Sequence, residues 1–464
     1  IFDIMKYIGK FAVAALVLSV AMSSCNIYKK FEMPTDSSEI AAAYVKARNG
    51  EADTTSFGTT PWRQVFTEPE LVALIEQALA NNNNLHQAKL NIDIAQAQLQ
   101  GAKLAFLPSV AIAPNGSGSA YKGTSMAWTY QIPLQVSWEI DIFGRLLNGK
   151  RGAQAALLQS EEYCQAVQSQ LIGSVAYCYY TISCLQSQLA LNLATAKTYE
   201  KSVEVMKNLK EAGRVNESAV VQTQAMYYGV MATTPQIEQQ LVEAYNSMSL
   251  LLNTMPQRWN VPMGSVLTTP AGMNREIAVS HLAGRPDVRA AEQGVALAYY
   301  AVNQARSNFY PSLNISANGG FTNLVGDMIT NPGKFFIQLA GQLTAPLFMR
   351  GQNISTLKIT KAQQEQAMKN FEYSIYNASA EVSNAMSLYD KTLEEGKMLD
   401  EQTFNLEKAV EYTMELLLYD GTSTYLEVII SQQNLLNAQR DRISNRLTQS
   451  QAVINLYQSL GGGK

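Results

Sequence analysis

Two stretches of this chain are free of proline over lengths that no compact domain contains. No proline lies between Pro133 and Pro235, and none follows Pro346. Within both stretches apolar residues recur every three to four positions, as along the seam of a coiled coil. A helix from Leu146 to Lys210 would be about 100 Å long at 1.5 Å per residue. The sequence therefore predicts long helices that pack side by side.

Four shorter segments have the period of two that is typical of β-strands: 109–122, 129–141, 312–322 and 336–347. In the clearest, apolar side chains alternate with Gln, Pro, Ser and Glu. Alternation over about ten residues suits a strand with one face in lipid and one in water. A water-soluble amphipathic sheet would give the same pattern and is the alternative.

Three aromatic residues lie within the second of these strands or directly before it. Trp128, Tyr130 and Trp138 are candidates for an aromatic belt at the membrane interface. Ordinary packing between strands is the alternative.

An internal repeat relates the two halves of the chain. Phe106–Ser109 matches Phe309–Ser312, and both halves follow one plan of helix, strand pair, long helix, glycine turn and helix. We expect four parts: a signal peptide, 1–24; an N-terminal segment, 25–69; a first repeat, 70–270, with its turn at 213; and a second repeat, 271–464, with its turn at 421.

The first residues have the composition of a secretory signal. A basic start precedes an apolar run from Phe11 to Met22, and two serines stand before Cys25. Such a segment is too short to span a bilayer. Met22–Cys25 resembles the lipobox of bacterial lipoproteins, so we expect a covalent lipid on Cys25. An ordinary signal peptide with a chance cysteine is the alternative.

Composition argues against a metal site, an enzyme and a nucleic-acid binder. The only histidines are His86 and His281, and the four cysteines show no CxxC spacing. A formal net charge of −3 does not provide the basic surface that nucleic acids require. Glu139 and Asp141 lie two apart on a predicted strand, with no acid–base partner in sight. We therefore expect no catalysis and no cofactor beyond the lipid.

The number of strands constrains the oligomeric state. Each half offers two strands, whereas the smallest bacterial membrane barrels have about eight. An open sheet edge in lipid would leave backbone amides unpaired. Several copies must therefore share one barrel, and three copies would supply twelve strands. The helices that leave the strands would continue its wall as a tube.

Motifs spread along the whole chain resemble those of one family. Besides the lipobox, they are Pro61–Arg63, Trp138–Arg145, Gly284–Glu292, Ala345–Phe348, Tyr419–Val428 and Leu456–Gly463. The chain resembles the TolC-like outer-membrane efflux proteins, in the lipoprotein branch (OprM/NodT type) that serves resistance-nodulation-division (RND) pumps. The resemblance implies a mainly α fold with membrane β: a homotrimer with a twelve-stranded β-barrel, four strands per chain, continued by a long periplasmic α-helical barrel.

The resemblance also implies a function and a location. The protein would be a lipid-anchored duct of the bacterial outer membrane, passively conducting small molecules when engaged by a periplasmic adaptor and an inner-membrane RND pump. A type I secretion duct and a non-channel coiled-coil surface lipoprotein are the alternatives. Two positions depart from the family pattern: Lys464 replaces the usual aromatic end, and Ala219 stands where the first turn often has Asp.

The two glycine turns would form the periplasmic tips of the helices. Asp420 is the candidate constriction, because a three-fold ring turns one carboxylate into three. Arg214 and Glu217 are candidates for ion pairs that hold the tips closed. Solvated turn residues with no role in gating are the alternative.

The same tips are the predicted adaptor-binding surface. Gly213 and Gly421 are expected to need positive φ at the turns. The predicted contact residues are Gly213, Val215, Gly421, Thr422 and Ser423.

Overall fold

The computed structural model describes residues 28–34, 39–49, 57–120, 122–123, 125–267, 282–324, 333–420 and 424–463. The predicted signal peptide, the lipidation site Cys25 and the turn residues Gly421, Thr422 and Ser423 lie outside the described residues. The chain divides into two compact units. The first comprises Ile1–Ala41, Leu90–Glu161 and Ala290–Tyr373; the second comprises Ala42–Lys89, Glu162–Arg289 and Ser374–Lys464.

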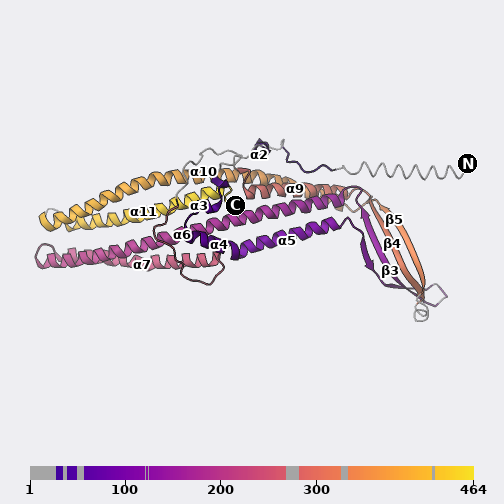
Figure 1. Ribbon diagram of the computed structural model, residues 1–464, viewed down its shortest axis with the longest axis horizontal. Coiled ribbons are helices and arrows are strands. Elements are labelled where there is room, and N and C mark those ends of the chain that lie inside the picture. Colours follow the sequence, from indigo (N-terminus) through magenta and orange to yellow (C-terminus); the bar gives the residue numbers. More distant parts are fainter. Residues whose placement is uncertain are drawn as a thin grey trace. The chain divides into compact units, whose positions relative to one another are not determined.

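The first unit is built on an antiparallel sheet of order β1-β3-β4-β5, with β2 also paired to β3 (Figure 1). The strands are β1 (Ser109–Ile112), β2 (Asn115–Ser119), β3 (Ala127–Ile140), β4 (Ser312–Leu324) and β5 (Lys334–Thr344). The segment 109–122, predicted as one strand, therefore forms two. Pro114 lies at the break, where it has no N–H to donate to the ladder.

A second proline lies inside β3 and is accommodated by a glycine. Pro133 is opposite Gly320 of β4. A Cβ at Gly320 would come within 2.2 Å of the Ile132 carbonyl oxygen and 2.8 Å of the Pro133 Cα. Only glycine allows the two strands to approach so closely at this point.

Four helices join the sheet where its strands end on one side, here called the helix-side edge. The register pairs Ser109 with Ser137, Ile140 with Leu313 and Ser312 with Thr344, so these strand ends lie together. The helices α5 (Asn83–Leu104) and α9 (Pro286–Ser307) run into this edge, and α6 (Arg145–Glu211) and α10 (Gln352–Glu415) run out of it.

Small apolar clusters hold these helices together in the first unit. Ala95 and Leu99 of α5 pack on Leu157 of α6, and Ala155 of α6 packs on Ala296 and Tyr300 of α9. Residues 28–34 lie against the same helices: Arg151 donates to the Tyr28 carbonyl at 3.0 Å, and the Phe31 N–H donates to the Tyr300 hydroxyl at 3.0 Å.

The second unit contains the largest apolar core. Leu71, Ile75 and Ala78 lie on one face of α4 (Pro69–Asn81), and they pack with Tyr179 of α6 and Tyr457 of α11. The remaining short elements are α2 (Glu39–Asn49), η2 (Phe57–Thr59) and α3 (Trp62–Val65).

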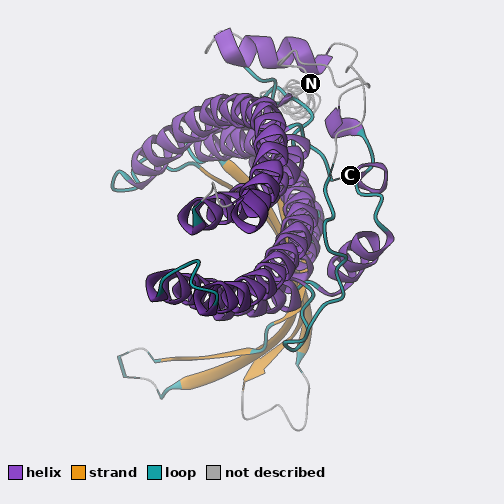
Figure 2. Cartoon of the chain, turned by 90° about the vertical axis from the view of Figure 1, so that its left-hand side faces the viewer, coloured by secondary structure: helices purple, strands orange, loops and turns teal. Residues whose placement is uncertain are grey.

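The long helices of this unit form two hairpins. The helix α6 lies beside α7 (Glu217–Leu251), and α10 lies beside α11 (Tyr425–Ser459), with a π-helical turn, Leu416–Asp420, at the end of α10 (Figures 1 and 2). Within the part of the chain described, no helix is both long and apolar enough to cross a membrane.

The C-terminal residues pack closely within the second unit. A Cβ at Gly58 would lie 2.0 Å from the Leu460 carbonyl oxygen, and one at Gly462 would lie 2.6 Å from the Tyr457 ring. The Tyr457 hydroxyl donates to the Thr60 carbonyl at 2.7 Å and accepts from the Gly463 N–H at 3.0 Å. The glycine run at the end of the chain therefore has a packing role.

Candidate functional site

One face of the sheet is apolar and exposed across all its main strands. Leu134 of β3 is opposite Gly319 of β4, which is opposite Ile337 of β5. The side chains on this face include Val110, Ile112, Trp128, Ile132, Leu134, Trp138, Ile315, Phe321, Phe335, Ile337, Leu339 and Leu343, each at least 39% exposed. This is far more contiguous apolar surface than a soluble monomer normally presents.

The opposite face of the sheet is polar. Gln135 is opposite Asn318, Ser137 is opposite Ser316, and Asn318 is opposite Gln338. On β2, Asn115 and Ser117 share this face, while the alternate positions are glycines. The sheet thus separates an apolar face from a hydrophilic one, which is the pattern of a strand with lipid on one side and water on the other.

The three predicted belt aromatics differ in exposure. Trp128 is 54% exposed and Trp138 is 40% exposed, whereas Tyr130 is only 9% exposed. The two tryptophans lie on the same face, near opposite ends of β3, and the Trp138 indole N–H donates to the Phe106 carbonyl at 2.9 Å. The role of these aromatics at a membrane interface stays a prediction. Because Tyr130 is buried, that prediction now concerns the two tryptophans alone.

Both sheet edges are open in the single chain. Among the described residues, β5 pairs with β4 alone, and β1 and β2 pair with β3 alone. Such edges present unpaired backbone N–H and C=O groups to their surroundings.

The carboxylates at the end of β3 are bound within the chain. Glu139 forms an ion pair with Arg145, whose Nε lies 2.9 Å from Oε1. Asp141 Oδ2 accepts from the Leu147 N–H at 2.7 Å and so satisfies a free donor at the start of α6. These interactions give both carboxylates structural roles where the chain passes from strand to helix.

The first tip connects α6 to α7 through a glycine turn. Gly213 has φ of 72°, the conformation expected for its turn. Glu217 forms an ion pair with Lys210 of the same hairpin, and both side chains are about half exposed. An exposed pair of this kind contributes little to stability. No sequence motif marks Lys210 as the partner of Glu217.

Arg214 reaches from the first tip to the second. Its Nη1 donates to the carbonyl of Leu418, in the π-helical turn, at 3.4 Å. The backbone of Asp420 ends that turn, and its side chain lies outside the described part of the chain. Thr424 then begins α11 with a capping box to Glu427. The gating roles of Arg214, Glu217 and Asp420 stay predictions.

A buried polar network joins the two hairpins farther from the tips. Asn192 of α6 is fully buried and donates to the Val230 carbonyl and to the Thr234 hydroxyl, each at 2.9 Å. Arg440 of α11 donates to the Asn192 side-chain oxygen at 2.5 Å and to the Thr233 hydroxyl at 3.2 Å. No sequence motif marked these residues, because single polar positions in long helices give no pattern.

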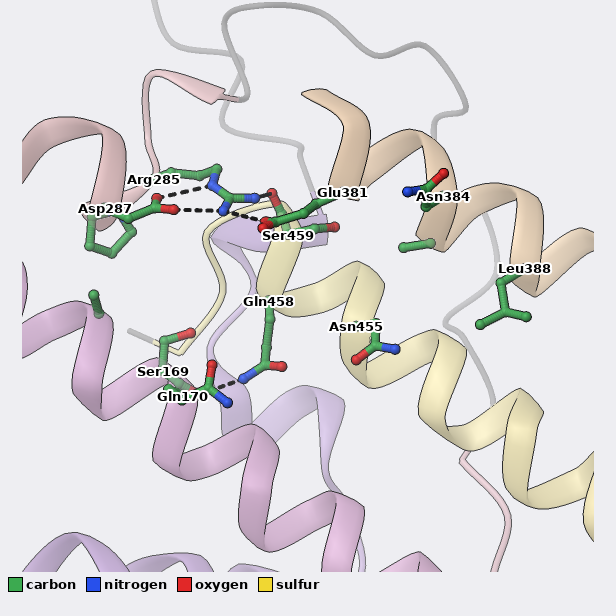
Figure 3. A pocket seen from close by; sticks show the side chains of 13 residues that line it. Ser169, Gln170, Arg285, Asp287, Glu381, Asn384, Leu388, Asn455, Gln458 and Ser459 are labelled. Carbon is green, nitrogen blue, oxygen red and sulfur yellow. Dashed lines mark hydrogen bonds and ion pairs between the residues drawn. The ribbon is translucent and has the colours of Figure 1, made fainter. Parts of the chain in front are cut away.

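A cavity lies where α9 begins, beside α6, α10 and α11 (Figure 3). It has a volume of about 560 Å³. Arg285, 5% exposed, donates to both oxygens of Asp287 at 3.0 and 2.7 Å, to Glu381 at 2.6 Å and to the Ser459 carbonyl at 2.7 Å. All these partners belong to the chain itself, so Arg285 links α9, α10 and α11.

The described residues include neither a metal-binding cluster nor a cysteine with a lowered pKa. No group of three or more His, Cys, Asp or Glu among the described residues is placed to bind a metal ion. Burial raises the pKa of Cys178 to about 12 and that of Cys184 to about 11. Neither thiol is therefore an activated nucleophile.

Residues 74–254 and 278–462 match the family described as outer membrane efflux protein. The "Probable efflux pump outer membrane protein TtgC" of Pseudomonas putida is 30% identical over 447 residues, covering 93% of this chain and 87% of that protein. The "Probable outer membrane lipoprotein SilC" of Salmonella typhimurium is 26% identical over 419 residues, covering 88% and 89%.

A solved structure of the outer-membrane channel OprN shares the fold. Its TM-score to this chain is 0.84 at 22% identity, and the match covers 94% of this chain and 99% of that one.

Proposed function

The chain belongs to the outer membrane efflux protein family, and from this membership and its amphipathic open sheet we propose that three copies form the exit duct of a tripartite efflux system. The duct would lie in the bacterial outer membrane and extend into the periplasm. Transport would be passive, with no catalytic step in this chain, and the energy would come from an inner-membrane RND pump.

The observation that carries the proposal is the sheet with one apolar face and two open edges. Five strand segments occupy four strand positions, too few to close in one chain. If β5 of one copy pairs with β1 and β2 of the next, both sets of free backbone groups are satisfied. Three copies then close twelve positions, with the apolar face toward lipid and the polar face toward water.

The spacing of the two exposed tryptophans supports a membrane band. Trp128 and Trp138 are ten residues apart on one face, or about 33 Å along a strand. A strand tilt of about 40° brings this to about 25 Å, which matches the apolar band of membrane barrels. The helices leave the sheet beyond the Trp138 end, which we assign to the periplasmic side.

The helical tips are the proposed gate and adaptor-binding surface. Arg214 links the first tip to the π-helical turn of the second, and Tyr419 in that turn is 86% exposed. π-Helical turns occur frequently at functional sites. An adaptor that displaces the weak bond from Arg214 to Leu418 would free the second hairpin to move and widen a ring of Asp420 side chains.

A lipid on Cys25 would anchor the duct in addition to the sheet. SilC, one of the relatives, is named as an outer membrane lipoprotein. In this chain Tyr28, three residues after Cys25, is held by Arg151 close to the helix-side end of the sheet. The lipid would therefore enter the same membrane as the apolar face.

Planar-bilayer recording tests this function. Purified lipidated protein is added to one side of a bilayer, and single-channel currents are measured at both polarities. We expect discrete, long-lived conductance steps. These steps should be less frequent for a variant with a disrupted sheet than for the wild type. A protein that associates with the bilayer but passes no current would contradict a duct.

A further inference from the structure

Positive charge is concentrated where the four helices meet the sheet. At each of the four strand ends we consider the fifteen residues on the helix side. These segments are 94–108, 141–155, 297–311 and 345–359. Their only acidic residue is Asp141. Their seven basic residues, here called the basic collar, are Lys103, Arg145, Lys150, Arg151, Arg306, Arg350 and Lys358. The whole chain has 38 acidic and 35 basic residues, so overall composition does not explain this distribution.

The collar lies along the end of the sheet that joins the helices, although its residues are far apart in sequence. The register brings together the ends of β1, β3, β4 and β5. Lys103 and Arg306 occupy the last turns of α5 and α9, which run into this edge. Lys150 and Lys358 lie in the second turns of α6 and α10, which leave it.

Most of the collar forms no ion pair within the part of the chain that the structure describes. Arg145 pairs with Glu139, and Arg151 donates to the Tyr28 carbonyl. The remaining five side chains are exposed and form no ion pair with any residue in the described ranges: Lys103, Lys150, Arg306, Arg350 and Lys358.

Helix electrostatics accounts for only part of the collar. Cations in a last turn complement the negative end of the helix dipole, which explains Lys103 and Arg306. The start of a helix favours the opposite charge. Yet α10 has no acidic residue in its first turn, and Arg350 stands two residues before that helix with φ of 52°. A stabilising role within the fold does not explain this charge.

We propose that the basic collar binds the phosphates of anionic phospholipids in the leaflet next to the helix-side edge of the sheet. Basic clusters beside a membrane segment attract such headgroups, and a charge-assisted bond to phosphate is strong. Trp138 and the stacked pair Phe143–Tyr310 lie at the same edge. The proposal rests on the proposed function, because only insertion of the sheet brings the collar to the headgroups.

The test measures the lipid composition around the reconstituted protein. Full-length lipidated protein is placed in vesicles of four parts phosphatidylethanolamine to one part phosphatidylglycerol. Polymer-bounded discs are then extracted, and their lipids are quantified by mass spectrometry. The collar variant is K103Q/K150Q/R306Q/K358Q, and the control K197Q/K201Q/K207Q/K397Q removes four exposed charges elsewhere on α6 and α10.

We expect phosphatidylglycerol to be enriched about threefold over the bulk vesicle around the wild type and the control. The collar variant should lose this enrichment, and K103R/K150R/R306K/K358R should retain it. Equal enrichment around the wild type and the collar variant would overturn the proposal.

Conductance in phosphatidylethanolamine vesicles separates this proposal from the proposed function. All variants should insert and conduct there, because the substituted side chains are exposed. Protein that conducts but gathers no phosphatidylglycerol contradicts the collar alone. Protein that does not insert contradicts the duct, and the collar proposal fails with it.

Discussion

A charge placed in the middle of the apolar sheet face should prevent insertion, whereas the same charge one residue away should not. Ile337 is 69% exposed and is opposite Gly319 and hence Leu134, midway between the levels of Trp128 and Trp138. Gln338, the next residue, faces the polar side. The pair I337R and Q338R therefore places the same arginine at neighbouring positions on opposite faces of the sheet.

An arginine at the midplane of a lipid-facing strand costs about 2–4 kcal/mol. At 1.4 kcal/mol per factor of ten, this lowers the folding equilibrium constant by roughly 30- to 700-fold for each chain. A trimer carries the cost three times. On the polar face, arginine would contact water in the lumen, and we expect an effect below about 1 kcal/mol.

The assay is refolding from urea into phosphatidylethanolamine vesicles, followed by the heat-sensitive mobility shift on a gel. I337R should need much less urea to unfold or should fail to insert, and Q338R should behave like the wild type. If the sheet instead faced water on both sides, I337R would be neutral or stabilising. That result would refute the assignment of the apolar face to lipid.

Three further predictions concern packing, thiol chemistry and the tips. G58A should lower trimer stability by about 1–3 kcal/mol in thermal unfolding, because the new Cβ would meet the Leu460 carbonyl oxygen. The control G101A should not destabilise the trimer, because no atom lies within 4 Å of its Cβ position. Burial raises the pKa of Cys178 to about 12, so its thiol stays neutral at pH 8. In the folded protein it should therefore resist iodoacetamide, and it should react after denaturation. Rapid labelling without denaturant would disprove the burial. Reversing the charge with D420K should change single-channel conductance or closed-state occupancy in planar bilayers, and unchanged currents would argue against a ring of carboxylates.

Much of the fold follows from patterns that repeat along the chain. The alternation at 129–141 lies almost wholly within β3, and the long proline-free stretches contain α6 and α10. The positive φ of Gly213 follows from the need to reverse direction between two helices. These features are local and periodic, so sequence alone specifies them.

The site residues that sequence did not reveal depend on contacts between distant elements. Periodicity places Tyr130 on the exposed face, but its burial is set by its surroundings in the folded sheet. The bond from Arg214 to Leu418 and the network of Asn192 with Arg440 join separate hairpins. No spacing within one helix reports such pairs, and the basic collar likewise becomes visible only when the strand register aligns four helix ends.

Counting the chains in the assembled particle tests the account most directly. Native mass spectrometry of the lipidated protein, released from detergent, gives the number of copies without any assumption about structure. We predict three chains per particle, since four strand positions per chain then close one wall. A stable monomer, or a particle that stays soluble after the detergent is removed, would contradict the shared barrel and the duct built on it.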